Sequence, residues 1–199
     1  MIENINWTSK STKTTMQKKL WKMILIVTIP LMLIIILVVA ISIGYGLQYN
    51  SILNNVTTAS DFNRDFTDTI KTKMYYYVID SQYSVGMPTE EVKSAEAIAR
   101  KLIDTTAERD SLRAINSVLN LCHNLEDKMQ EIAVTEGYDS RMSQLNDNIY
   151  VMADLIQEYM YTYLYYEAVH LDALQSTMIT NMVVLMGVVV VLALGLLFF

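Results

Sequence analysis

Two long stretches without a charged residue constrain this chain more than any other feature. No Asp, Glu, Lys or Arg lies between Met23 and Ser60, and none follows Asp172 before Phe199. A helix of about 20 apolar residues, rising about 1.5 Å per residue, crosses the hydrocarbon core of a bilayer. A soluble domain of this size does not need two such runs. The sequence therefore predicts two transmembrane helices, residues 22–47 and 178–199.

Charge is divided unequally by the first of these segments. Five lysines and one acidic residue precede position 23, whereas residues 48–178 hold ten Lys or Arg against twenty Asp or Glu, a balance of −10. Lysines beside a first span stay on the cytoplasmic side. Residues 1–21 are therefore expected to be a cytoplasmic tail, without regular structure over 1–15, and residues 48–177 to be extracytoplasmic. An acidic pI near 4.9 also argues against nucleic acid as a partner.

The chain between the spans is predicted to be helical, because six glycines and two prolines are too few for many turns. Apolar stripes indicate helices over residues 48–83, 89–103, 110–134 and 141–177. Breaks at 84–88 and 134–138 are clear, and a third is expected at 104–110, since a chain that leaves and re-enters one membrane face needs an even number of helices. The predicted fold is all-α: an antiparallel four-helix bundle between two transmembrane helices.

The last predicted helix has the most regular pattern. Its apolar positions alternate in steps of three and four, as in a helix packed lengthwise against partner helices. These positions are Met142, Leu145, Ile149, Met152, Ile156, Tyr159, Tyr163, Tyr166, His170 and Ala173.

Few residues in the sequence are candidates for catalysis or metal binding. No catalytic motif, phosphate-binding loop or zinc motif is present. Cys122 and His123 are neighbours, so on a helix they point in different directions and are poorly placed to share a metal ion. A single cysteine excludes an internal disulfide. The sequence accordingly predicts no catalytic residues, no metal site and no cofactor in these 199 residues.

Tyrosine is unusually frequent, with 13 residues. Tyr75, Tyr76 and Tyr77 are consecutive in the first predicted external helix, and a second group lies at 159–166 in the last. Because tyrosine combines an apolar ring with a hydroxyl, these residues suit a bundle core, a dimer face or a small-ligand pocket. For the pocket, the candidate ligand-binding residues are Tyr75, Tyr76, Tyr77, Arg100, Arg109 and Arg113.

Several sequence segments resemble a known class of receptor. A basic tail, a span containing Ile29-Pro30-Leu31, a helical external region and a second span occur in the input half of bacterial membrane sensor histidine kinases, particularly clostridial ones. The segments 73–78, 109–113 and 163–171 are similar to recurring segments of such sensors.

The resemblance implies an extracytoplasmic sensing and transmembrane signalling module in a bacterial plasma membrane, working as a homodimer with an extracellular small molecule or peptide as stimulus. In that family a linker, a phospho-accepting histidine and an ATP-binding domain follow the second span, so the sequence is expected to be the input part without its kinase. Two alternatives remain: the input half of a methyl-accepting chemoreceptor, or a small two-span scaffold or accessory protein.

Overall fold

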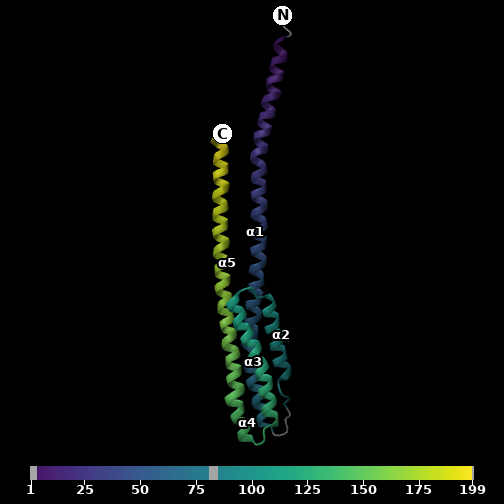
Figure 1. Ribbon diagram of the computed structural model, residues 1–199, viewed down its shortest axis with the longest axis vertical. Helices are drawn as coiled ribbons and strands as arrows, with labels where there is room; N and C mark the ends of the chain where they lie inside the picture. Colours follow the sequence, from purple (N-terminus) through teal and green to yellow (C-terminus); the bar gives the residue numbers. More distant parts are fainter. Residues whose placement is uncertain (1–3, 81–84, 199) are drawn as a thin grey trace. The chain divides into compact units, whose positions relative to one another are not determined.

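The computed structural model describes residues 4–80 and 85–198, and within those ranges the backbone is helical apart from short connections, with no strand. Figure 1 shows the elements. They are α1 (Asn4–Ile79), α2 (Thr89–Thr105), α3 (Arg109–Val134), α4 (Tyr138–Gln144), a π-helical turn η1 (Leu145–Tyr150) and α5 (Val151–Phe198).

The described residues form two compact units. The first, here called the apolar unit, consists of the chain up to Gly46 and from Thr177; the second, the helical unit, is Leu47–Ser176.

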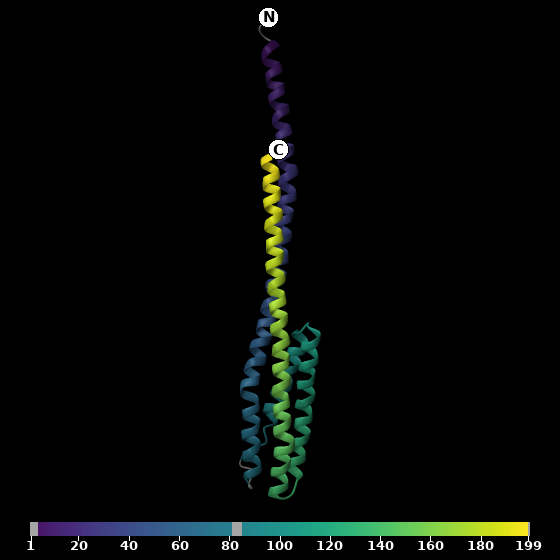
Figure 2. The same ribbon diagram turned by 90° about the vertical axis from the view of Figure 1, so that its left-hand side faces the viewer.

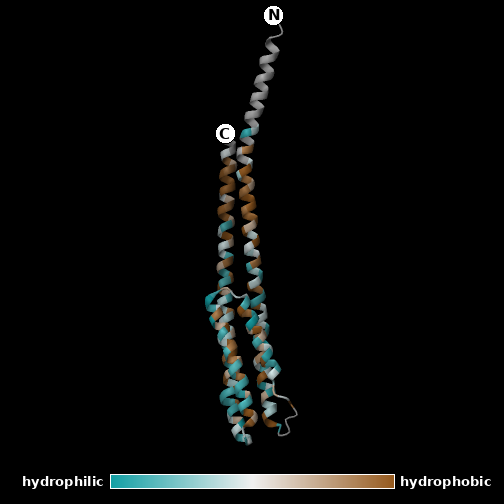
Figure 3. Cartoon of the chain, turned by 45° about the vertical axis from the view of Figure 1, so that its right-hand side comes forward, coloured by the Kyte–Doolittle hydropathy of each residue, from teal (hydrophilic) through white to brown (hydrophobic). Residues whose placement is uncertain are grey.

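The apolar unit contains the stretches that give α1 and α5 enough length and apolar character to cross a membrane. Figure 3 colours most residues of both stretches as hydrophobic. The most apolar window of each helix is not buried against protein at all, which distinguishes it from the core helix of a soluble protein. Leu33 and Val191, for example, are 62% and 68% exposed. Exposed apolar surface on this scale is typical of contact with lipid or a partner.

Helix α1 starts earlier than the sequence predicts. Residues 1–15 are expected to lack regular structure, yet α1 begins at Asn4. No glycine or proline occurs before Pro30, so no residue in the tail is of a type that ends a helix. The other end is earlier than expected: α1 stops at Ile79 rather than near Tyr83, and residues 81–84 lie outside the described part.

The helical unit is organised around one hydrophobic core, to which α1, α2, α3, η1 and α5 all contribute. Helices α2 and α3 pack against each other, and α5 lies beside α1 and α3 (Figures 1 and 2). On α2 the buried positions are Val92, Ala95, Ala99 and Leu102, the face that the sequence pattern indicates. The largest fully buried side chains are Tyr163, Ile70, Met74, Leu102, Ile115, Leu125, Met129, Ile132, Leu145, Ile149, Ile156 and Met160.

The connections between helices contain residues of types that end one helix or cap the next. Thr106–Glu108 separate α2 from α3, inside the predicted break at 104–110, and the Glu108 carboxylate accepts a hydrogen bond of 2.6 Å from the backbone N–H of Ser111 at the start of α3. Between α3 and α4, Gly137 has φ of 84°, a conformation that residues with a Cβ rarely adopt.

The predicted apolar seam of the last helix is only partly right. Leu145, Ile149, Ile156 and Tyr163 are buried as expected. At four other positions the buried residue is the next one along the chain: Ala153, Met160, Glu167 and Leu174 replace Met152, Tyr159, Tyr166 and Ala173. The remaining two predicted positions, Met142 and His170, are half-buried.

The π-helical turn explains this shift. A π turn hydrogen-bonds i to i+5 and so contains about one residue more than an α-helical turn. The extra residue in η1 rotates the following helix relative to a regular three-four pattern. Tyr159 and Tyr166 are thereby moved from the core to its edge.

Candidate functional site

A cleft of about 210 Å³ lies between α3 and α5 in the helical unit. Two tyrosines, three small or hydroxyl-bearing residues and one pair of opposite charges line it. These are Tyr159, Tyr166, Ala114, Ser117, Thr162, Asp110 and Arg113. The volume is below the roughly 300–1,000 Å³ of drug-sized ligand pockets. The cleft therefore suits a ligand no larger than an amino acid, or a side chain of a partner.

The charges in the cleft largely cancel. Arg113 Nη1 donates a hydrogen bond of 3.0 Å to Asp110 Oδ1, one turn earlier on α3. Because the guanidinium already has a carboxylate partner, an anionic ligand would have to compete with Asp110. A zwitterionic or neutral polar ligand fits this charge balance better than a simple anion.

The sequence-predicted ligand residues do not gather at one place. Arg113 lines the cleft, whereas the other five are not among its lining residues. Tyr75 and Tyr76 are exposed on α1 and contact each other edge to face at 5.9 Å between ring centroids. Tyr77 packs against the core.

The other two predicted arginines, Arg100 and Arg109, lie outside the cleft. Arg100 on α2 lies 3.9 Å from the Glu96 carboxylate, and Arg109 is the exposed first residue of α3. The tyrosines that line the cleft, Tyr159 and Tyr166, belong to the second group seen in the sequence. Their role at the cleft depends on the π turn, which the apolar pattern alone does not reveal.

A buried polar group lies next to this cleft on α5. Tyr163 is fully buried, and its hydroxyl lies 2.9 Å from the hydroxyl of Thr106. Burial raises the pKa of Tyr163 to about 12. Glu167, one turn later, is 1% exposed, and its Oε1 has no hydrogen-bond partner. Burial also raises the pKa of the Glu167 carboxyl, so this group favours its neutral form.

A second cluster, Glu96, His123 and Glu126, joins α2 and α3 and has the side-chain types of a metal site. Cys122 and His123, neighbours in the sequence, point in different directions as predicted: Cys122 is buried, and the His123 side chain is 70% exposed. The signal that was missed is the His-x-x-Glu spacing of His123 and Glu126, which places both on one helix face.

No family model matches the chain, and no curated protein or solved structure matches it. The class of protein is therefore defined by the fold alone. It is an all-helical chain with two helices long and apolar enough to cross a membrane.

Proposed function

We propose that this chain is the signal-sensing and transmembrane signalling module of a bacterial sensor histidine kinase. Residues 48–177 form an extracytoplasmic antiparallel four-helix bundle, and residues 22–47 and 178–199 anchor it in the plasma membrane. The N-terminal tail is cytoplasmic, in accord with its lysines. The module works as a homodimer and responds to a small molecule or peptide outside the cell.

The observation that carries the proposal is the helical continuity of α1 and α5. Helix α1 supplies an apolar segment up to Gly46 and core residues such as Ile70, with no non-helical residue between them. Helix α5 likewise supplies the buried Ile156 and the apolar residues from Met178 onward. A change in packing around α5 can therefore be passed to its apolar segment as a shift or rotation of one helix.

The apolar unit offers one specific link between its two helices. The Asn181 side-chain amide donates a hydrogen bond of 3.1 Å to the hydroxyl of Tyr45. In lipid, such polar contacts join helices, at an average of roughly 0.6 kcal/mol. This contact would keep the two spans in register while allowing small movements.

The orientation is tested by labelling single cysteines in intact cells. Glu136→Cys introduces an exposed thiol in the α3–α4 connection, and Ser11→Cys adds a cysteine to the tail. The native Cys122 is buried, and burial raises its pKa to about 12, so it adds little background. A membrane-impermeant maleimide is expected to label the first variant in intact cells and the second only after permeabilisation. The opposite pattern rules out an extracytoplasmic helical unit.

Signal transmission is tested in a chimera that joins the chain to the cytoplasmic half of a characterised sensor kinase with a reporter. Inserting one to four residues after Phe199 turns the attached helix by about 100° per residue. Kinase output is expected to rise and fall with the period of a helix. Output that is identical for all four insertions contradicts transmission through α5.

Dimerisation has a separate test. Leu53 is an exposed apolar residue of α1 in the helical unit, at 44% exposure. Oxidation of the Leu53→Cys variant in membranes is expected to give a disulfide-linked dimer. Ser51→Cys and Asn54→Cys, also exposed, map the orientation of the interface. Failure of all three variants to crosslink argues for a monomer.

A further inference from the structure

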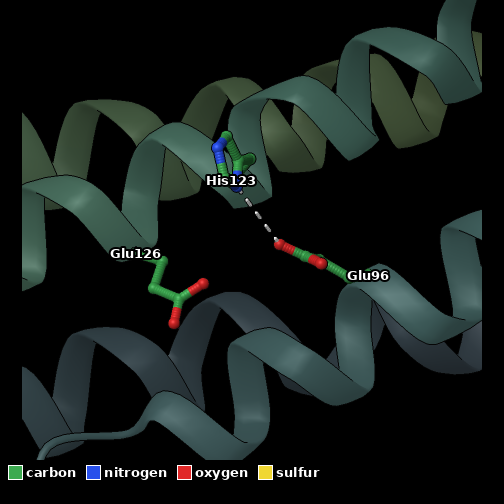
Figure 4. Close-up of side chains that lie close together, drawn as sticks. All are labelled: Glu96, His123 and Glu126. Carbon is green, nitrogen blue, oxygen red and sulfur yellow. Dashed lines mark ion pairs between the residues drawn. The ribbon is translucent and has the colours of Figure 1, made fainter.

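Glu96, His123 and Glu126 lie close together, as Figure 4 shows. Glu96 comes from α2, whereas His123 and Glu126 lie three residues apart on α3 and so share a helix face. One ligand-type atom from each of the three side chains lies within 4.8 Å of the other two. Two helices thus bring one imidazole and two carboxylates to a common point.

The spacing leaves room between the groups. His123 Nδ1 lies 4.0 Å from Glu96 Oε1, which is too long for a hydrogen bond. The same Glu96 oxygen is buried and has no hydrogen-bond partner. A cation about 2.0–2.2 Å from each ligand atom holds a pair of ligands roughly 3–4 Å apart. The unpartnered oxygen and the imidazole nitrogen therefore have the separation of two ligands on either side of a metal ion.

The ligand types select the kind of cation. Imidazole is a ligand of first-row transition metals and Zn²⁺, whereas Ca²⁺ and Mg²⁺ prefer all-oxygen sites. Two carboxylates balance the charge of a divalent ion. Three protein ligands leave a fourth position for water, and the His123 side chain, 70% exposed, allows the ion to enter from solvent.

One neighbouring group opposes a cation. Arg100 Nη2 lies 3.9 Å from Glu96 Oε2, whereas His123 Nδ1 is nearest to the other oxygen of that carboxylate, Oε1. Its positive charge lowers the affinity of the site for a metal ion. Replacing Arg100 by a neutral residue should therefore raise the affinity for a cation, whereas replacing a ligand residue should lower it.

We propose that Glu96, His123 and Glu126 form a binding site for one first-row divalent cation, represented by Zn²⁺. The site joins α2 to α3, so the bound ion crosslinks two helices of the helical unit. Cation binding is independent of the sensory function proposed above and can be measured directly.

The test is calorimetric titration of ZnCl₂ into the full chain, purified in detergent without a histidine tag. One ion per chain is expected to bind. Glu96→Gln, His123→Ala and Glu126→Gln are each expected to weaken binding by about tenfold or more. Asp127→Asn, an exposed carboxylate next to Glu126, is the matched control and is expected to bind like the wild type. Arg100→Ala is expected to bind several-fold more tightly.

Three results overturn the proposal. The first is the absence of saturable Zn²⁺ binding by the wild-type chain. The second is equal binding by His123→Ala and wild type, and the third is an equal loss in Asp127→Asn and Glu126→Gln; either of these two shows only general attraction to an acidic surface. Far-UV circular dichroism of every variant checks that the helices remain. Because the His123 side chain is mostly exposed, its removal leaves the core intact.

Discussion

The hydroxyls of Thr106 and Tyr163 lie 2.9 Å apart and both residues are buried, so the short connection between α2 and α3 is hydrogen-bonded to the part of α5 in the helical unit. The neighbouring Thr105 also takes part in a link, donating from its hydroxyl to Asn55 Oδ1 of α1 at 2.9 Å. Thr105, the last residue of α2, and Thr106, the first residue of the connection, thus contact both long helices. This arrangement couples the position of α5 to that of α1 within the helical unit.

Removing the Tyr163 hydroxyl is expected to weaken this coupling. In Tyr163→Phe the ring still fills the core, but the buried Thr106 hydroxyl loses its partner. The free energy of unfolding is expected to fall by about 1 kcal/mol. Thermal unfolding in detergent, followed by circular dichroism, measures the change. Tyr161→Phe is the matched control, because Tyr161 is 59% exposed and its hydroxyl is in contact with solvent. Equal effects of the two substitutions would show that the Thr106 contact adds no stability.

Cys122 is expected to be unreactive while the chain is folded. Its side chain is fully buried, and burial, aided by the nearby negative charge of Glu96, raises its pKa to about 12. Only the thiolate reacts, and about one thiol in ten thousand is ionised at pH 8 for such a pKa. A maleimide is therefore expected to modify Cys122 only after denaturation. Asn124→Cys, an exposed position on α3, serves as the positive control. Rapid single labelling of the native wild type would contradict the buried position.

Apolar patterns predict the helices of this chain well, because each core face is determined by residues a few positions apart. The faces of α2 and α3 follow from such spacing: Val92 and Ala99 on one, Ile115 and Cys122 on the other. The π turn could not be predicted, since the choice between Tyr159 and Met160 as the buried residue depends on backbone hydrogen bonds. Candidate sites are harder to predict from the sequence than helices are. Glu96 and Glu126 are 30 positions apart, and only the packing of α2 on α3 brings them together.

Glu167 is expected to make the stability of the helical unit depend on pH. Its ordinary carboxyl pKa is 4.5, and burial raises the pKa in the folded chain, with the charge of Glu108 acting in the same direction and that of His170 opposing it. The folded state therefore binds this proton more tightly than the unfolded state. The contribution to stability is fully present below the unfolded pKa and is lost as the pH rises through the folded pKa.

A neutral side chain at position 167 removes that loss. Glu167→Gln is expected to be more stable than the wild type above the folded pKa, by on the order of 1 kcal/mol, with the advantage disappearing toward the unfolded pKa. Thermal unfolding over a pH series measures the difference. Glu158→Gln, an exposed carboxyl earlier in α5, is the control and is expected to leave the pH profile unchanged. If Glu167→Gln has the same dependence of stability on pH as the wild type, the pKa of the Glu167 carboxyl does not differ between the folded and unfolded states.

Deleting one residue from the π turn tests whether η1 contains one extra residue. Asn146 is exposed within η1, and its deletion allows the turn to become α-helical. The buried positions from Leu145 to Tyr163 then follow a regular alternation of three and four. The deletion variant is therefore expected to keep its fold and to change the unfolding free energy by less than about 1 kcal/mol.

Deleting Glu158, which is also exposed but lies in regular helix, is the control. This deletion turns all later residues by about 100° and moves Tyr163 out of the core. That variant is expected to lose several kcal/mol, as measured by circular dichroism during thermal unfolding. If both deletions destabilise the chain equally, η1 does not contain a removable residue, and another cause must explain the burial of Met160 in place of Tyr159.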